Sequence, residues 1–226
     1  MASPPLPWGI AAFLRRNRNL ALLAWCGVFA LCLCSAVLTT RADDPKPTPA
    51  NTIHVVLSEP VSPQKFQLPV KFNVVDVVDR AGNPQPMLVT NGHGAIFVDR
   101  LPAEIVRDAI ESSLKSADLL AADASSADVT LGVYLFHFGL AAGSGGDYFG
   151  KVELAVTVKN PKTGKSQQVS ASGTSISRIA MLKKNAMKNL EENLTSALGD
   201  AVRNLLRGQA LRDAVTKTMA ESSTGN

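Results

Sequence analysis

The spacing of hydrophobic residues along the chain predicts two early strands and two well-separated helices. β-Branched and other apolar residues are concentrated in 52–58 and 69–79, a composition typical of strands. Apolar residues recur at helical spacing over 101–117. The same spacing predicts a longer helix from about residue 178 to residue 207, ended by Gly208.

Three further strands are predicted between these helices. The segment 127–140 is apolar on both faces, which indicates a central strand. The segment 150–160 alternates apolar and polar residues, and 166–175 continues as a more polar strand after a short turn. A weaker helix follows at 209–220. This order predicts an α+β fold, a two-layer sandwich in which two main helices pack on one face of an antiparallel sheet.

The N-terminal residues 1–42 have the character of an export signal or membrane anchor. Their apolar run, 20–38, contains no charged residue and follows three arginines. The positive-inside rule keeps those arginines in the cytoplasm and places the remainder of the chain on the periplasmic side. Two outcomes stay open: an uncleaved helix in the inner membrane, or secretion after cleavage near Ala42.

The rest of the chain divides into a tether, one domain and a tail. Prolines are spaced through the polar segment 43–51, which predicts a stiff, extended tether. Residues 52–220 are expected to form a single α+β periplasmic domain, and 221–226 a disordered tail.

Charge and cysteine content narrow the function classes. The net charge of +4 lies entirely in the leader, because the remainder has 19 basic and 19 acidic residues. Such a neutral body lacks the basic surface that nucleic-acid binding requires, so no nucleic-acid partner is predicted. The three cysteines all lie in the apolar run, so the exported part has no disulfide framework and no thiolate metal site.

Two short stretches share letters with a phosphate-binding loop. Gly145 to Lys151 reads Gly-x-x-x-x-Gly-Lys, but Val152 stands where the loop requires Ser or Thr. Residues 164–166 read Gly-Lys-Ser without the first glycine of the motif. Each stretch runs into a predicted strand instead of a helix, so no nucleotide is expected to bind. The glycines are assigned to hairpin turns that need positive φ.

No catalytic, cofactor-binding or metal-binding residue is predicted. The three histidines are scattered along the sequence, whereas a metal site needs several converging donors. Asp76, Asp79 and Arg80 form the most notable charged group, and the favoured interpretation is a capped strand end with a local ion pair. The chain is therefore expected to be non-enzymatic.

Five aromatic residues are the candidate contacts for a partner. In strict alternation, Tyr134, Phe136 and Phe138 share one side of the strand 127–140, and its aliphatic residues occupy the other. Two helices cover only one face of a sheet, so the aromatic side is a candidate contact surface. The glycine-rich loop 141–150 carries Tyr148 and Phe149, which are expected to be exposed. Two interpretations of this loop stay open: part of the contact surface, or a plain mobile connector.

The stretch from roughly Val70 to Lys217 resembles the YajG-like family of bacterial envelope lipoproteins. The resemblance lies in the strand "VKFNVVDVVDR", the helix entering "IVRDAIESSLKSADLLAAD", the hairpin strands and the helix "NAMKNLEENLTSALGDAVRNLL", in that order. It implies a periplasm-facing, non-enzymatic domain. The chain departs from the family because its cysteines lack the preceding small residue of a lipid-attachment signal, which leaves the apolar run as the anchor.

These observations together predict a non-enzymatic cell-envelope protein. Its exported domain is expected to act as an interaction module, held to the membrane by 20–38 and bound to an envelope protein partner. The alternative is an auxiliary lipid- or ligand-binding component of an envelope transport system.

Overall fold

The fold belongs to the second of the two units into which the chain divides, Met1–Asp44 and Pro45–Asn226. A computed structural model describes residues 46–66, 69–81, 87–90, 95–142, 147–178 and 185–220. The apolar run 20–38 and the tail 221–226 lie outside these residues. Within the described ranges, no helix is long and apolar enough to cross a membrane.

The main sheet has four strands in the order β2-β5-β6-β7. Their bounds are β2 (Phe72–Asp79), β5 (Val129–Ala142), β6 (Asp147–Lys159) and β7 (Ser166–Arg178). The last three form the predicted antiparallel meander. β2 instead pairs parallel with β5, so the sheet is mixed where the sequence suggested an antiparallel one. The reason is the crossover between β2 and β5, which contains a helix and returns the chain in the same direction.

A second, small sheet was not predicted. It consists of β1 (Thr52–Ile53), β4 (Ala95–Val98) and β3 (Met87–Thr90), in the order β1-β4-β3. Strands of two to four residues carry too few positions for a recognisable alternation. Of the strand predicted at 52–58, only the first two residues pair with another strand.

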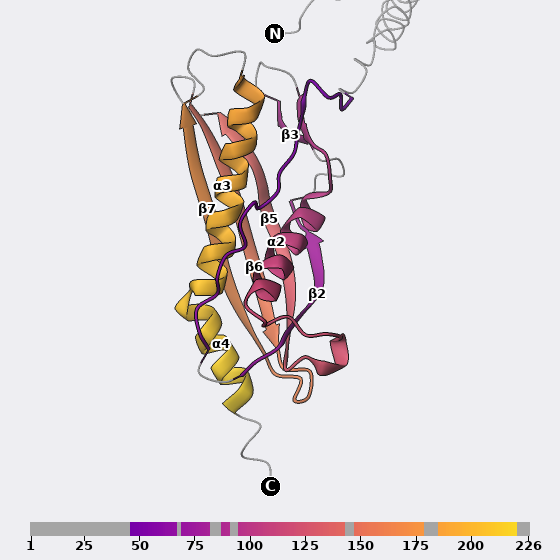
Figure 1. The fold of residues 1–226 in the computed structure, drawn as a ribbon, viewed down its shortest axis with the longest axis vertical. Helices are drawn as coiled ribbons and strands as arrows, with labels where there is room; N and C mark the ends of the chain where they lie inside the picture. The colour runs from indigo at the N-terminus through magenta and orange to yellow at the C-terminus, as the bar shows by residue number, and fades with distance from the viewer. Residues whose placement is uncertain are drawn as a thin grey trace, which may run out of the picture. The chain divides into compact units, whose positions relative to one another are not determined.

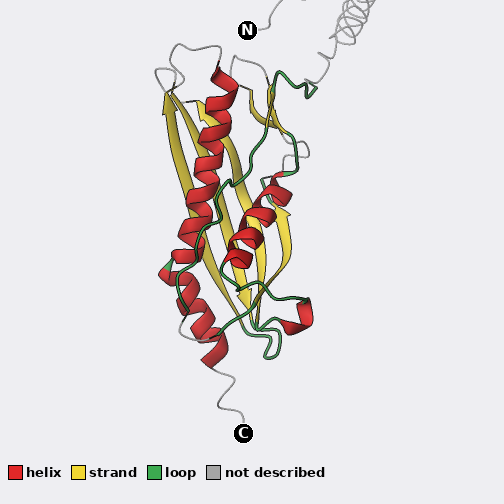
Figure 2. Cartoon of the chain, in the orientation of Figure 1, coloured by secondary structure: helices red, strands yellow, loops and turns green. Residues whose placement is uncertain are grey.

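The helices lie on one face of the main sheet, which confirms the α+β class (Figures 1 and 2). Their bounds are α2 (Pro102–Ser116), α3 (Ala186–Arg207) and α4 (Gln209–Ala220), with a short 3-10 turn, η1 (Ala124–Ser126). α3 begins at Ala186, later than predicted, and Arg178, the predicted start, is the last residue of β7. The core lies between this layer and the sheet, where Leu194 and Leu198 of α3 and Val152 and Val156 of β6 are fully buried.

α3 approaches the sheet most closely at two strand glycines. A Cβ atom on Gly173 of β7 would overlap the backbone of Ala197 and Ala201. A Cβ atom on Gly150 of β6 would lie 2.8 Å from the backbone oxygen of Asn193. Only glycine leaves room for a helix backbone at this distance.

Two asparagines of α3 fix the helix to the strands beneath it. The buried amide of Asn193 donates to the Tyr148 carbonyl at 2.8 Å and accepts from the Gly150 N–H at 3.2 Å. Asn204 donates to the Ser172 carbonyl at 2.7 Å. Both the NH2 group and the oxygen of the buried Asn193 amide therefore have a hydrogen-bond partner, which avoids the free-energy cost of burying an unpaired polar group.

Residues 54–66 run along the helices on the side away from the main sheet (Figure 1). The backbone N–H of Val61 donates to the Ser113 hydroxyl at 3.0 Å, and that of Gln64 donates to the Leu206 carbonyl at 3.2 Å. Arg207 donates from Nε to the Ser62 carbonyl at 2.9 Å. This segment therefore covers the helices on the side away from the main sheet.

Replacing Gly173 with alanine should destabilise the fold strongly, because the new methyl group meets helix backbone that cannot rotate away. We expect the free energy of unfolding, measured by urea denaturation, to fall by about 2 kcal/mol or more. The matched control is Gly132→Ala in β5, where the nearest atom to the new Cβ is 4.0 Å away and the change should stay under about 1 kcal/mol. Equal effects of the two substitutions would contradict the close-approach explanation.

Candidate functional site

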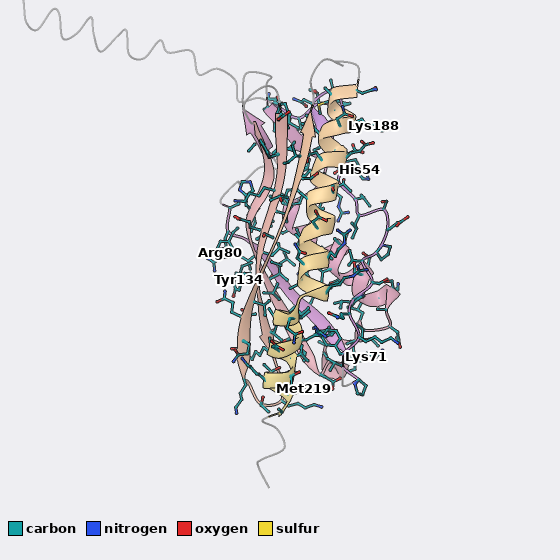
Figure 3. All side chains as sticks on the ribbon, turned by 90° about the vertical axis from the view of Figure 1, so that its left-hand side faces the viewer. His54, Lys71, Arg80, Tyr134, Lys188 and Met219 are labelled. Atoms are coloured by element: carbon teal, nitrogen blue, oxygen red, sulfur yellow. The ribbon has the colours of Figure 1, made fainter. Side chains whose placement is uncertain are left out.

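The candidate site is the face of the main sheet opposite the helices, here called the open face. Figure 3 shows Arg80 and Tyr134 on this side of the strands, with α3 on the other side. Its described side chains include Tyr134, Phe136 and His137 of β5, Phe149, Lys151 and Glu153 of β6, and Ile176 of β7. Aromatic, aliphatic and charged groups are therefore mixed on one surface.

A β-bulge places Phe136 on the open face. Leu135 pairs with Leu154 and His137 pairs with the next residue, Glu153, so Phe136 is an extra residue in β5. Its side chain is 52% exposed. A bulge leaves one residue unpaired and shifts the strand beyond it by one position.

That shift makes the prediction for Phe138 wrong. Strict alternation puts Phe138 on the same face as Tyr134 and Phe136. After the bulge it pairs with the buried Val152 and faces the helices, where only 5% of it is exposed. The alternation of apolar residues gives no signal for the bulge, because β5 is apolar on both faces.

The two aromatic residues of β6 also differ from each other. Tyr148 is only 8% exposed, so its predicted exposure is wrong. It belongs to the inward-facing set of β6, beneath the Asn193 side chain that bonds its carbonyl. Phe149 is 36% exposed and pairs with Ile176 of β7, which is 66% exposed. Sequence analysis missed Ile176, the one large apolar residue in the outward-facing positions of β7.

Arg80 stacks on an aromatic ring of the open face. Its guanidinium carbon lies 5.5 Å from the centroid of Tyr134, within the range of a cation–π contact. The predicted cap is confirmed, since Asp79 accepts from the Ala81 N–H at 2.8 Å. The ion pair expected within this group is not among those of the described residues; Asp76 instead lies 3.9 Å from Arg107 of α2.

A shallow hollow of about 360 Å³ opens beside Phe136. Its open-face lining comes from small or polar residues of the two neighbouring strands, namely Glu153, Ala155, Ser170 and Ser172. Small side chains flanked by one large aromatic ring form a surface that can receive a side chain from another molecule.

His137 lies between two charges of β6. Lys151 and Glu153 form an ion pair of 2.8 Å beside it. Burial lowers the pKa of His137 below its ordinary value of 6.5, the nearby Lys151 lowers it further, and Glu153 opposes both. The Nε2 atom of this imidazole is buried without a hydrogen-bond partner among the described groups.

The two stretches that resemble a phosphate-binding loop lead into strand β6 and into the β6–β7 hairpin, as predicted. Lys151 lies within β6, and Gly164 occupies the turn between β6 and β7 with a φ of 74°. Gly150 has a different role from the one predicted, because it makes room for Asn193 rather than for a turn. Nucleotide binding itself stays untested, and its absence stays a prediction.

The described part of the chain contains no group of three or more His, Asp or Glu side chains that could hold a metal ion. His54 bonds through Nδ1 to Asp99, and its backbone N–H donates to Glu191 at 3.0 Å. This arrangement ties the segment before the helices to α3.

Comparison with known proteins shows the fold. No family model and no curated protein matches the chain. Protein XCC0632 from Xanthomonas campestris, of the family DUF330, superimposes with a TM-score of 0.50 at 14% identity, covering 69% of this chain and 94% of that one. A PelC dodecamer variant from Paraburkholderia phytofirmans has a TM-score of 0.39 at 14% identity, covering 65% of this chain and 96% of that one. Lipoprotein GNA1162 from Neisseria meningitidis has a TM-score of 0.25 at 14% identity, covering 53% of this chain and 91% of that one. The resemblance to the YajG-like family stays a prediction.

The lowered pKa of His137 predicts a pH dependence of stability. The folded state binds this proton less tightly than the unfolded chain, so protonation favours unfolding. We expect the free energy of unfolding to fall as the pH drops through 6.5 and to do so less in His137→Gln. Urea denaturation at pH 7.5 and pH 5 measures the difference between the two chains, and the NMR titration midpoint of the His137 ring should lie below 6.5. A midpoint above that value would contradict the assigned cause.

Proposed function

We propose that the protein is a non-enzymatic component of the bacterial cell envelope whose exported domain binds another envelope protein through the open face. The observation that carries the proposal is the exposure of apolar side chains on the open face, where the bulge residue Phe136 is 52% exposed. A sheet with helices on one side normally turns a polar face to water, and here a half-exposed phenylalanine stands beside an open hollow on that face.

The chemistry of the open face suits a protein partner. Protein interfaces combine aromatic anchors with a polar surround, and here Phe136 and Phe149 stand among Lys151, Glu153 and the serines of β7. The charged groups are already paired locally, as in the Lys151–Glu153 ion pair. Binding energy at this surface would therefore come mainly from burial of the aromatic rings.

The proposed location rests on the leader. Arginines before an uncharged run of apolar residues direct the C-terminal remainder of a chain across the inner membrane. The proline-spaced tether would hold the domain off the membrane surface, where a partner can reach it. The proposal of a non-enzymatic role rests on the sequence, which offers no nucleophile motif and no phosphate loop.

Site-specific photocrosslinking in the native membrane tests this proposal. A photoreactive amino acid at Phe136 should capture one envelope protein reproducibly. The control is the same substitution at Leu101, which precedes α2, lies away from the open face and is equally exposed at 52%. The crosslinked band should appear only with the probe at Phe136, and protease added to spheroplasts should reach the domain.

Three results would count against the proposal. Equal capture at Phe136 and Leu101 would indicate nonspecific contact. A domain protected from protease in spheroplasts would remove the proposed location. Lipid captured at Phe136 without any protein would favour the lipid- or ligand-binding alternative.

A further inference from the structure

β7 forms one edge of the main sheet, and its backbone groups on that edge define a second surface, here called the β7 edge. The strand is 13 residues long and pairs with β6 on its other side. Figure 3 views the molecule from the β7 side and shows α3 beside the sheet. The Asn160 amide donates to the Thr218 carbonyl of α4 at 3.1 Å, which places the end of that helix near the start of β7.

The hairpin hydrogen bonds show which residues direct their backbone outward. The Asn160 N–H donates to the Lys165 carbonyl at 2.9 Å, so these two residues form a hydrogen-bonded pair. Hydrogen-bonded and non-hydrogen-bonded pairs alternate along an antiparallel ladder. The even-numbered residues of β7 therefore turn their N–H and C=O groups away from β6. The outward set comprises Ser166, Gln168, Ser170, Ser172, Thr174, Ile176 and Arg178.

One of these outward groups has a partner. Asn204 of α3 donates to the Ser172 carbonyl at 2.7 Å, and this is the only hydrogen bond from outside the sheet to the β7 backbone among the described residues. Exposed edge strands are commonly protected by a proline, by charged side chains or by a covering segment. β7 has no proline, and no charged side chain occurs between Ser166 and Ser177.

Two apolar side chains, Ile176 and Phe149, lie next to the outward backbone groups of β7. Ile176 is the most exposed of the large apolar side chains on the described residues, and it lies beside Phe149 of β6 on the open face. A strand added next to β7 would place its own side chains against Ile176. The absence of charged residues from Ser166 to Ser177 favours an uncharged segment with an apolar residue opposite Ile176.

A second copy of the chain fits this edge less well. Two copies of β7 related by a twofold axis would pair antiparallel, which turns the N-terminal ends of the two described domains in opposite directions. Where the leader is retained as an anchor, two leaders in the same membrane would oppose that arrangement. A segment of a different protein meets no such restriction.

We propose that the β7 edge, from Ser170 to Ile176, binds an extended, uncharged segment of a partner protein as an additional strand of the sheet. Strand addition of this kind derives its affinity from main-chain hydrogen bonds and its specificity from alternate side chains. The inference rests on the proposed function, because it assigns a binding mode to the same protein partner.

A peptide of defined sequence tests the edge directly. The probe is a fluorescein-labelled Lys-Thr-Val-Thr-Val-Thr-Val-Thr-Lys amide, whose Thr-Val core is the uncharged segment and whose terminal lysines keep it soluble. It is titrated against the full-length chain in detergent and followed by fluorescence anisotropy. Binding should be saturable. Thr174→Pro should weaken it by about tenfold or more, because proline removes an outward donor. Thr174→Val keeps that donor and should bind within about twofold of the natural chain.

Two controls separate loss of binding from loss of folding. Proline is tolerated where the N–H of an edge strand faces solvent, so urea denaturation should show Thr174→Pro to be folded. Ile176→Lys leaves the backbone intact and adds a charge to the edge, and it should weaken binding as well. A peptide with N-methylated central residues should not bind.

The proposal is overturned if the N-methylated peptide binds equally well, if Thr174→Pro and Thr174→Val bind alike, or if no binding occurs. Self-association of the chain that Thr174→Pro abolishes would make a second copy the occupant and would overturn the stated partner. Photocrosslinking at Phe136 is independent of these results. Loss of strand addition with crosslinking retained would leave the proposed function intact.

Discussion

The close contact between α3 and the strands beneath it determines how the rest of this domain is arranged. The helix backbone rests on Gly173 and Gly150, and the Asn193 amide bonds both the carbonyl and the N–H groups of β6. A larger residue at either glycine would push the helix away from the sheet and remove those hydrogen bonds together. Because α3 lies so close, its leucines reach deep into the core with the apolar residues of β5 and β6.

This contact also explains why the domain has one covered face and one open face. α2, α3, α4 and the segment 54–66 all lie on the same side of the main sheet, so none of these elements covers the other side. β7 lies beneath α3 yet remains the edge of the sheet, so Ile176 and the outward backbone groups other than the Ser172 carbonyl, which Asn204 bonds, stay accessible. The buried contact and the two accessible surfaces are thus consequences of the same packing.

The sequence predicts the parts of the fold that have a clear period. The β5–β6–β7 meander and α2 follow from alternation and helical spacing, and α3 and α4 from their apolar faces. The short strands β3 and β4 could not be found in this way. The parallel pairing of β2 with β5 depends on where the connection between them packs, and the alternation of apolar residues within either strand does not reveal this.

At the candidate site, the alternation of apolar residues fails to predict which aromatic side chains are accessible, because one inserted residue in β5 decides it. Without the bulge at Phe136, Phe138 would face solvent; with it, Phe138 joins the core opposite Val152. A second bulge, at Val75, lies in the neighbouring strand β2. That bulge lies opposite Leu131 and Gly132 of β5, and the bulge at Phe136 follows further along the same strand; each bends and twists its strand locally. The exposed ring is therefore a product of backbone geometry, and a chain with the same composition and regular strands would bury different residues and present a different surface.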